Sequence, residues 1–105
     1  MFVEERIYTL QPGTQGNFIS VVENEGFQVQ KEILGRPAGY YYTEFGPLNQ
    51  IVHMWAYRDL EDRREKRAKL MADPRWQAIR PKFTSLIVSQ ENKFLIPAKG
   101  WTIPE

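Results

Sequence analysis

The stretch from Gly46 to Arg67 constrains the fold more than any other part of the chain, because three structural signals follow one another there. Residues 46–49 read Gly-Pro-Leu-Asn, which is typical of a tight turn. Residues 50–57 then alternate with the two-residue period of a β-strand. Asp59 is suited to cap a helix, and almost every residue from Asp59 to Lys69 is charged. The sequence therefore predicts a turn, a strand and a solvated helix in direct succession.

The two faces of the predicted strand differ in chemistry. Val52, Met54 and Ala56 form an apolar face, whereas the other face carries Ile51, His53, Trp55 and Tyr57. We expect the apolar face to pack against helices and the aromatic face to point away from them. His53 is the only histidine of the chain, so a site that uses an imidazole must include it.

The remaining elements complete a recognisable order. They are a strand over residues 2–10, a helix that starts near Gln15 and breaks or ends at Gly26, a strand over residues 40–45 paired as a hairpin with 50–57, a short helix from Pro74 to Pro81, and a last strand within residues 83–96. The order β-α-β-β-α-(α)-β predicts an α+β, ferredoxin-like split β-α-β fold. It has a four-stranded antiparallel sheet with helices on one face.

The sheet face without helices would then carry many aromatic side chains. They are Tyr8, Tyr40, Tyr42, Trp55 and Tyr57. This is too much aromatic surface to leave in water, so we expect two copies to pack sheet to sheet as a homodimeric α/β barrel. Residues 1–97 would form the domain, and residues 98–105 a C-terminal tail without periodicity.

Composition and charge exclude several functional classes. With 14 basic and 13 acidic residues the net charge is +1, which favours neither nucleic acid nor an anionic membrane as a partner. The chain has no cysteine, so disulfides, thiol catalysis and thiolate metal sites are excluded. No apolar run approaches the roughly 18 residues of a membrane span, and the N-terminus lacks a secretory signal pattern. We therefore expect a cytoplasmic protein.

Three segments resemble the NIPSNAP family. They are E-E-R-I-Y-T-L-Q-P-G at Glu4–Gly13, G-Y-Y-Y-T-E-F-G-P-L-N-Q-I-V-H-M-W-A-Y at Gly39–Tyr57, and the charged R-x-x-R helix followed by D-P-x-W. The similarity runs in order from Val3 to Pro97, and T-E-x-G-P-L-N-Q-x-x-H-x-W is a specific motif within it. The resemblance implies a ferredoxin-like fold of the dimeric α/β-barrel superfamily, usually as a homodimer. It implies no particular reaction.

In that fold, the sheet face opposite the helices would gather polar groups from three strands. They are Glu4, Arg6 and Tyr8, then Tyr40, Tyr42 and Glu44, then His53 and Trp55. Such a set suits general acid–base chemistry on a small planar molecule, with Arg6 neutralising an anion or enolate. We expect Glu4 or Glu44 to hold His53 and to raise its pKa above about 6.5. Ligand contacts are expected from Tyr8, Tyr40, Tyr42, Asn49 and Trp55.

Two function classes remain open at this point. One is a small-molecule-binding domain, extending to a cofactor-free enzyme of the monooxygenase or isomerase kind. The other is a structural or protein-interaction module in which Glu4, Arg6 and Glu44 only satisfy one another within the dimer interface. No cofactor and no metal are expected, since the chain lacks a phosphate-binding glycine loop and a two-histidine pattern. The arginines of the charged helix are expected on a solvated face, and Met71 and Trp76 in the core or the dimer contact.

Overall fold

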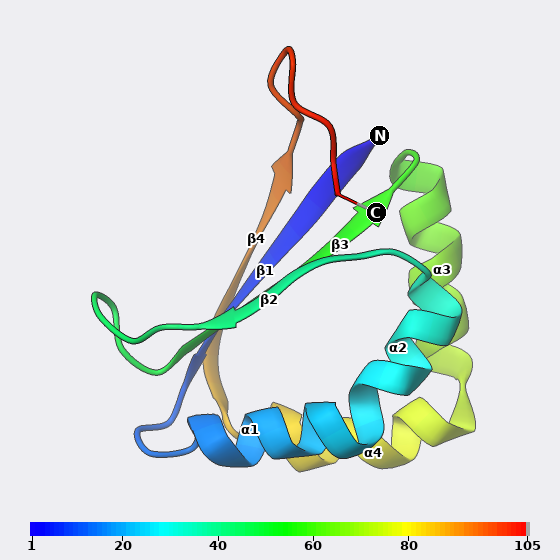
Figure 1. The fold of residues 1–105 in the computed structure, drawn as a ribbon. Helices are drawn as coiled ribbons and strands as arrows, with labels where there is room; N and C mark the ends of the chain where they lie inside the picture. Colours follow the sequence, from blue (N-terminus) through cyan, green and yellow to red (C-terminus); the bar gives the residue numbers. More distant parts are fainter. Residues whose placement is uncertain (105) are drawn as a thin grey trace.

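The computed structural model describes residues 1–104 as one antiparallel sheet with helices on a single face (Figure 1). The elements are β1 (Phe2–Leu10), α1 (Gln15–Val21), η1 (Val22–Gly26), α2 (Phe27–Leu34), β2 (Pro37–Tyr42), β3 (Gln50–Tyr57), α3 (Leu60–Ala72), α4 (Pro74–Thr84) and β4 (Ile87–Leu95). The strand order is β2-β3-β1-β4, and each neighbouring pair is antiparallel. This confirms the predicted α+β, ferredoxin-like fold.

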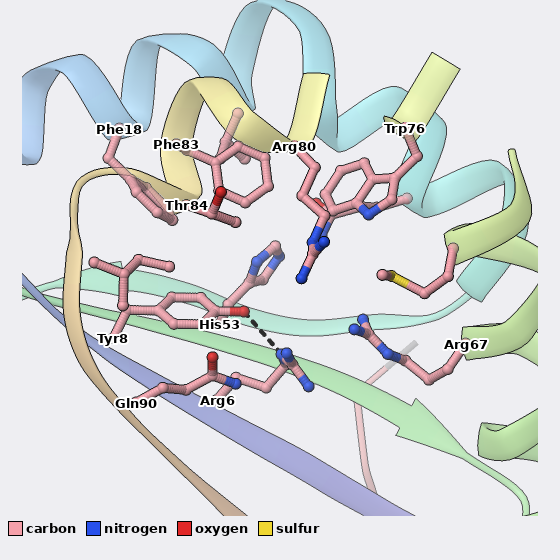
Figure 2. Close-up of a pocket in the computed structure, with 14 residues that line it drawn as sticks. Arg6, Tyr8, Phe18, His53, Arg67, Trp76, Arg80, Phe83, Thr84 and Gln90 are labelled. Atoms are coloured by element: carbon pink, nitrogen blue, oxygen red, sulfur yellow. Dashed lines mark hydrogen bonds between the residues drawn. The ribbon is translucent and has the colours of Figure 1, made fainter. Parts of the chain in front are cut away.

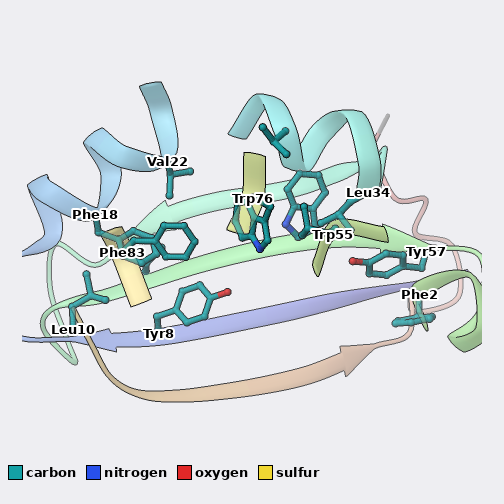
Figure 3. Close-up of a cluster of buried hydrophobic side chains, with 13 residues drawn as sticks. Phe2, Tyr8, Leu10, Phe18, Val22, Leu34, Trp55, Tyr57, Trp76 and Phe83 are labelled. Carbon is teal, nitrogen blue, oxygen red and sulfur yellow. The ribbon is translucent and has the colours of Figure 1, made fainter. Parts of the chain in front are cut away.

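The hydrophobic core fills the space between the sheet and the helices (Figure 3). β1 lies in the middle of the sheet and supplies Phe2, Tyr8 and Leu10, while β3 beside it supplies Trp55 and Tyr57. The helices contribute a second aromatic layer, in which Phe18, Trp76 and Phe83 are the largest side chains. Aromatic residues bury the most apolar area per side chain, so these rings account for much of the stabilisation of the fold.

The two faces of the sheet are the reverse of the prediction from sequence. Ile51, His53, Trp55 and Tyr57 lie beneath the helices, and His53 exposes only 2% of its surface. Val52 and Met54 lie on the opposite face and are partly exposed. The aromatic face is covered because burial of Trp and Tyr side chains removes more surface from water than burial of Val, Met and Ala does. The charged groups Glu4 and Arg6 are accommodated beneath the helices by pairing with each other, and the imidazole is accommodated in its neutral form.

Two boundaries also differ from the prediction. β2 runs from Pro37 to Tyr42 instead of over residues 40–45, which leaves Glu44 in the exposed loop before β3. Proline can begin this strand because β2 is an edge of the sheet. Pro81 does not end α4, which continues to Thr84 and therefore takes Phe83 away from the last strand. That strand, β4, starts at Ile87.

The helical segment after β1 continues through Gly26 instead of ending there. α1 and α2 are joined by η1, a π-helical turn that ends at the buried Gly26. Gly26 faces the Trp76 ring of α4, and a Cβ atom there would lie 3.6 Å from the ring, at ordinary van der Waals contact. The π-helical turn places Val22 over the sheet, and such turns are common near functional sites.

The C-terminal tail folds back against the edge of the sheet near β2. Arg36 Nη2 donates to the carbonyl oxygen of Ile103 over 2.7 Å, and the Ile103 side chain is buried. Together with Val3, Tyr41 and Met54 of the open sheet face, the tail encloses a groove of about 480 Å³. Within residues 1–104, no helix has the length and apolar character that crossing a membrane requires.

Candidate functional site

A cavity of about 90 Å³ lies between the sheet and the helices (Figure 2). Arg6 and Tyr8 of β1 and His53 of β3 line it from the sheet side. Arg67 reaches in from α3 and Arg80 from α4, with both guanidinium groups directed toward the cavity. The mouth is formed by the exposed lining residues, which are Met71, Arg80 and Gln90. A small molecule could therefore enter between α3, α4 and β4.

Helical spacing explains why arginines of a highly charged helix point inward. Asp59 caps α3 by accepting a hydrogen bond of 2.7 Å from the Asp62 backbone N–H, as the sequence predicted. From that start, Arg63, Arg67 and Leu70 follow at spacings of four and three residues, which places them on one face. Leu70 is fully buried, so this face turns toward the sheet and carries both arginines with it.

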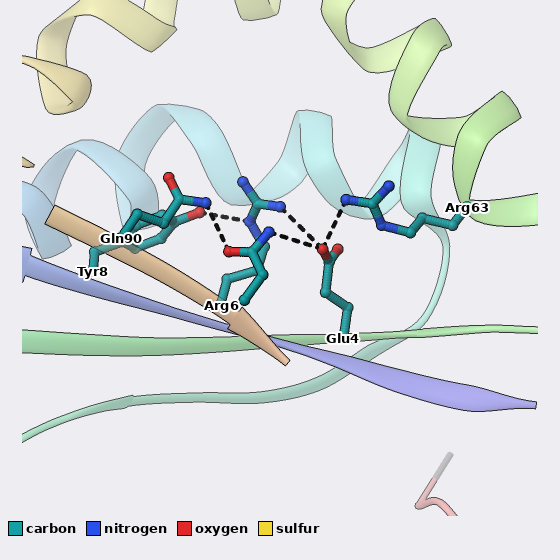
Figure 4. A network of polar contacts seen from close by, with 6 residues as sticks. Glu4, Arg6, Tyr8, Arg63 and Gln90 are labelled. Carbon is teal, nitrogen blue, oxygen red and sulfur yellow. Dashed lines mark hydrogen bonds and ion pairs between the residues drawn. The ribbon is translucent and has the colours of Figure 1, made fainter. Parts of the chain in front are cut away.

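A buried carboxylate anchors the arginines beside the cavity (Figure 4). Glu4 Oε2 accepts from Arg63 Nη2 at 2.8 Å, from Asn92 Nδ2 at 3.1 Å and from Arg6 Nη1 at 3.3 Å. The Glu4 side chain is fully enclosed, so this charge depends on its two arginine partners. Glu4 therefore fixes the position of Arg6 and does not itself line the cavity.

Arg6 also binds the hydroxyl group of Tyr8, two residues further along the same face of β1. Arg6 Nε donates to Tyr8 Oη over 2.8 Å (Figure 2). A phenol oxygen that accepts a hydrogen bond can still donate its own proton. The Tyr8 hydroxyl is therefore free to donate to a third group.

His53 sits among aromatic rings and cations. Its cross-strand neighbours are Arg6 on β1 and Tyr40 on β2, and its ring lies 4.6 Å from the Tyr40 ring and 5.0 Å from the Trp55 ring, centroid to centroid. Burial lowers the pKa of His53 to about 3, and the positive charges of Arg6 and Arg67 act in the same direction. The imidazole is therefore neutral at physiological pH.

The prediction that a carboxylate holds His53 and raises its pKa is wrong. In the strand register Glu4 lies opposite Trp55, and its carboxylate binds arginines. The residue opposite His53 on β1 is Arg6. Glu44 lies beyond the end of β2 in the exposed loop. No carboxylate among residues 1–104 is hydrogen bonded to the imidazole, and its environment consequently disfavours the charged form.

Three buried polar atoms on residues that line the cavity have no hydrogen-bond partner in the described part of the chain. They are His53 Nε2, Gln30 Oε1 and the indole nitrogen Nε1 of Trp76. They come from β3, α2 and α4, three different elements that each contribute to the cavity wall. Buried polar groups are nearly always satisfied, so these three atoms make the cavity a candidate site for a bound molecule or ordered water.

The other predicted site residues are divided between the surroundings of His53 and the surface. Tyr40 and Trp55 pack on the imidazole but do not line the cavity, and burial raises the pKa of Tyr40 to about 12. Tyr42 is exposed at the end of β2. Asn49 adopts a positive φ of 63° and its carbonyl oxygen accepts from the Leu10 N–H, so its role is in the turn. Of the nine predicted residues, the cavity itself brings together His53, Arg6 and Tyr8.

Sequence reasoning missed Arg67 and Arg80. Arg67 was assigned to a solvated helix face, although its spacing to the apolar Leu70 indicates the inner face. Arg80 lies four residues after Trp76 and three before Phe83, and both aromatic residues are buried. This signal was hidden because Phe83 was expected in a strand and the helix was expected to end at Pro81. Among the described residues, no cluster of three or more metal-ligand side chains is present.

Known proteins resemble this chain over nearly its whole length. A family model described as NIPSNAP matches residues 3–100. A NipSnap homologue from Dictyostelium discoideum is 40% identical over 96 residues, which cover 91% of this chain and 42% of that protein. The chain thus spans less than half the length of this curated relative. A solved NIPSNAP family protein of unknown function from Agrobacterium tumefaciens is 47% identical, with a TM-score of 0.95 over 99% of this chain and 94% of that one.

A more distant likeness concerns the fold alone. A solved antibiotic biosynthesis monooxygenase has a TM-score of 0.65 over 93% of this chain and 99% of that one, at 8% identity. This places the chain among ferredoxin-like folds of that kind and carries no argument about chemistry. The family match and the closely similar solved structure agree with the motifs in the sequence. The chain belongs to the NIPSNAP family.

Proposed function

We propose that this protein binds a small molecule in the cavity between the sheet and the helices, one ligand to each subunit of a homodimer. The observation that carries the proposal is the convergence of three unpartnered buried polar atoms, on His53, Gln30 and Trp76, at one cavity. Each of them loses hydrogen bonds to water on folding, and a bound molecule with complementary groups restores those bonds.

Binding accounts for the site better than a purely structural role. The network around Glu4 holds strands and a helix together, because Arg63 and Asn92 both donate to Glu4 Oε2, although Glu4 Oε1 and Arg63 Nε have no partner. The unpartnered atoms of Trp76 on α4 and Gln30 on α2 differ in that their residues line a cavity, where a bound molecule can reach them. Ordered water is the competing occupant, and the experiment below separates the two.

Binding also accounts for the site better than acid–base catalysis by His53. A general base works best when its pKa lies near the working pH. The pKa of His53 is lowered to about 3, so the imidazole is a weak base and serves as a neutral hydrogen-bonding group. We therefore assign the site to ligand binding.

Dimerisation would use the open face of the sheet. Tyr41 is 62% exposed there and Leu95 39%, beside the partly exposed Val3 and Met54. An apolar sheet face of this kind is normally covered by another surface. Packing two such faces together would leave both cavities uncovered, because each lies on the other side of the sheet, beneath the helices.

Metabolite capture by a plugged and an unplugged variant tests the proposal. Thr84 lines the cavity and Ser85 beside it does not, so Thr84→Trp fills the cavity and Ser85→Trp is the matched control. The proteins are equilibrated with the fraction of a cell extract below about 1 kDa, separated from free compounds, and analysed by mass spectrometry. Circular dichroism establishes that both variants are folded.

The expected result is one or more compounds retained by the natural protein and by Ser85→Trp but lost from Thr84→Trp. Retention that is the same in all three proteins would place binding elsewhere. If none of the three retains any compound, water is the occupant of the cavity and the structural interpretation holds.

A further inference from the structure

We infer that the ligand of this cavity is a small oxyanion, such as a carboxylate, whose charged group lies between Arg6, Arg67 and the hydroxyl of Tyr8. The inference rests on the proposed function and specifies its ligand class. It follows from the charges around the cavity, from the direction of the Tyr8 proton and from the size of the space.

The charges around the cavity are unbalanced in favour of an anion. Arg6, Arg67 and Arg80 line it, whereas no carboxylate among residues 1–104 does so. The nearest acidic group, Glu4, is bound by both Arg6 and Arg63 and is therefore shared between two cations. Arg67 and Arg80 form no ion pair with any described residue. Arg80 is exposed to solvent, whereas the largely buried Arg67 lacks a counter-charge among the described residues.

Arg67 is the side chain that gains most from an anion. Its guanidinium group is largely buried, and that burial together with the nearby charge of Arg6 lowers its pKa. Guanidinium groups form bidentate hydrogen bonds with planar oxyanions, and such bonds are stronger than bonds between neutral groups. An anion between Arg67 and Arg6 would relieve the repulsion between them and satisfy their free N–H groups.

The Tyr8 hydroxyl adds a donor with a fixed direction. Its oxygen already accepts from Arg6 Nε at 2.8 Å, so its proton is available for a second partner. Tyr8 lines the cavity, as do the guanidinium groups of Arg6 and Arg67 (Figure 2). An anion accepts hydrogen bonds only, which matches the N–H and O–H donors of Arg6, Arg67 and Tyr8. The unpartnered acceptor Gln30 Oε1 would be satisfied by a donor on another part of the ligand.

The size of the cavity limits the group that it holds. A dry cavity of about 150 Å³ accommodates benzene, and this one measures about 90 Å³. It therefore fits a head group of a few non-hydrogen atoms, such as a carboxylate with a short substituent. A longer ligand would extend through the mouth past Arg80 and Gln90, which are exposed.

Acetate and acetamide are a matched pair of probes for this inference, because they have nearly the same shape and differ in charge. Each is titrated into the protein at neutral pH and constant ionic strength, with sodium chloride as the balancing salt. The imidazole signals of His53, the only histidine, report on the cavity in NMR spectra. Two variants accompany the natural protein: Arg67→Met, and Lys69→Met, which removes an equal charge from an exposed position on the same helix.

Acetate is expected to shift the His53 signals saturably, and acetamide to leave them unchanged. Arg67→Met should weaken acetate binding about tenfold or more, as the loss of a charge-assisted hydrogen bond does, while Lys69→Met should remain within about twofold. Equal shifts by both probes, unaffected by Arg67→Met, would overturn the anion inference and leave the proposed small-molecule site intact. No shift by either probe would also overturn it, and metabolite capture then decides the proposed function independently. If acetate shifts the His53 signals equally, and with equal affinity, in Arg67→Met and in Lys69→Met, the effect is a non-specific ion effect and the inference is rejected.

Discussion

Glu4 shows how a single buried side chain organises the polar interior. It lies on the central strand, completely enclosed, and three donors from β1, α3 and β4 converge on one of its oxygens. A carboxylate costs several kcal/mol to bury alone, so its burial requires the arginines. Of these arginines, Arg6 is in turn held at the wall of the cavity. Glu4 thus links the stability of the fold to the geometry of the site.

Replacing Glu4 by Gln should lower the free energy of unfolding by about 3 kcal/mol, because Arg6 and Arg63 would remain buried without a counter-charge. Glu5→Gln is the matched control, since Glu5 is the next residue on β1 and points to the open face. The control should change stability by less than about 0.5 kcal/mol. Urea unfolding monitored by tryptophan fluorescence measures both. Equal, small losses in the two variants would refute the structural role of this carboxylate.

At the scale of elements, sequence patterns located β1 and β3 correctly because alternation over eight or nine residues is a strong signal. The signals at proline residues were right only in part. Pro74 opens α4 as predicted, whereas Pro81 lies inside that helix instead of ending it, and β2 begins at Pro37 instead of at residue 40. The edge position of β2 and the packing of α4 permit these prolines, and neither is visible in a local window. Glu44 could not reach His53 because the register of the hairpin pairs His53 with Tyr40, four residues before Glu44.

The N-cap of α3 is an element-scale feature that can be tested directly. Asp59→Ala should lower the free energy of unfolding by about 1 kcal/mol, since the Asp62 N–H loses its acceptor. Asp59→Asn should retain most of the stability because asparagine also caps helices well. Thermal unfolding of the two variants side by side provides the measurement. A loss as large in Asp59→Asn as in Asp59→Ala would mean that the cap bond is not the cause.

At the scale of the molecule, the sequence identified the fold and part of the site but not the side of the sheet on which the site lies. The strand residues Arg6, Tyr8 and His53 share one face by simple alternation, so their proximity was predictable. Which face the helices cover depends on how much area each layer buries, and that sum involves residues distant in sequence. The cavity was not predicted because two of its lining residues, Arg67 and Arg80, were misplaced. Arg67 was expected on a solvated helix face, and the helix that carries Arg80 was expected to end at Pro81.

The reversed faces change what a substitution at Met54 should do. Met54 lies on the open face, so Met54→Asp should prevent dimerisation and leave the folded subunit intact. Light scattering should give about twice 12.4 kDa for the natural protein and 12.4 kDa for the variant. His53 and the cavity lie on the other side, so the imidazole NMR signals should stay close to their natural positions. A natural protein that is already monomeric would contradict this assignment of the dimer surface.

Burial of His53 should make global stability depend on pH in a defined window. The pKa of His53 is about 3 in the folded protein, against 6.5 for an ordinary imidazole, so between these values the unfolded chain binds more protons. Protonation then favours unfolding. Stability should be constant above pH 6.5 and fall by about 1 kcal/mol between pH 6 and pH 5. Urea unfolding of His53→Gln should lack this slope, and an equal slope in the variant would assign it to other groups.

The most direct test of the account is the NMR titration of the single imidazole. The central claim is that His53 lies beneath the helices among arginines, neutral and without a carboxylate partner, at the wall of the cavity. His53 is expected to remain unprotonated down to at least pH 5, in keeping with a pKa of about 3. A pKa at or above 6.5 would instead require a carboxylate partner or a solvent-exposed ring, and would contradict the arrangement described for this site.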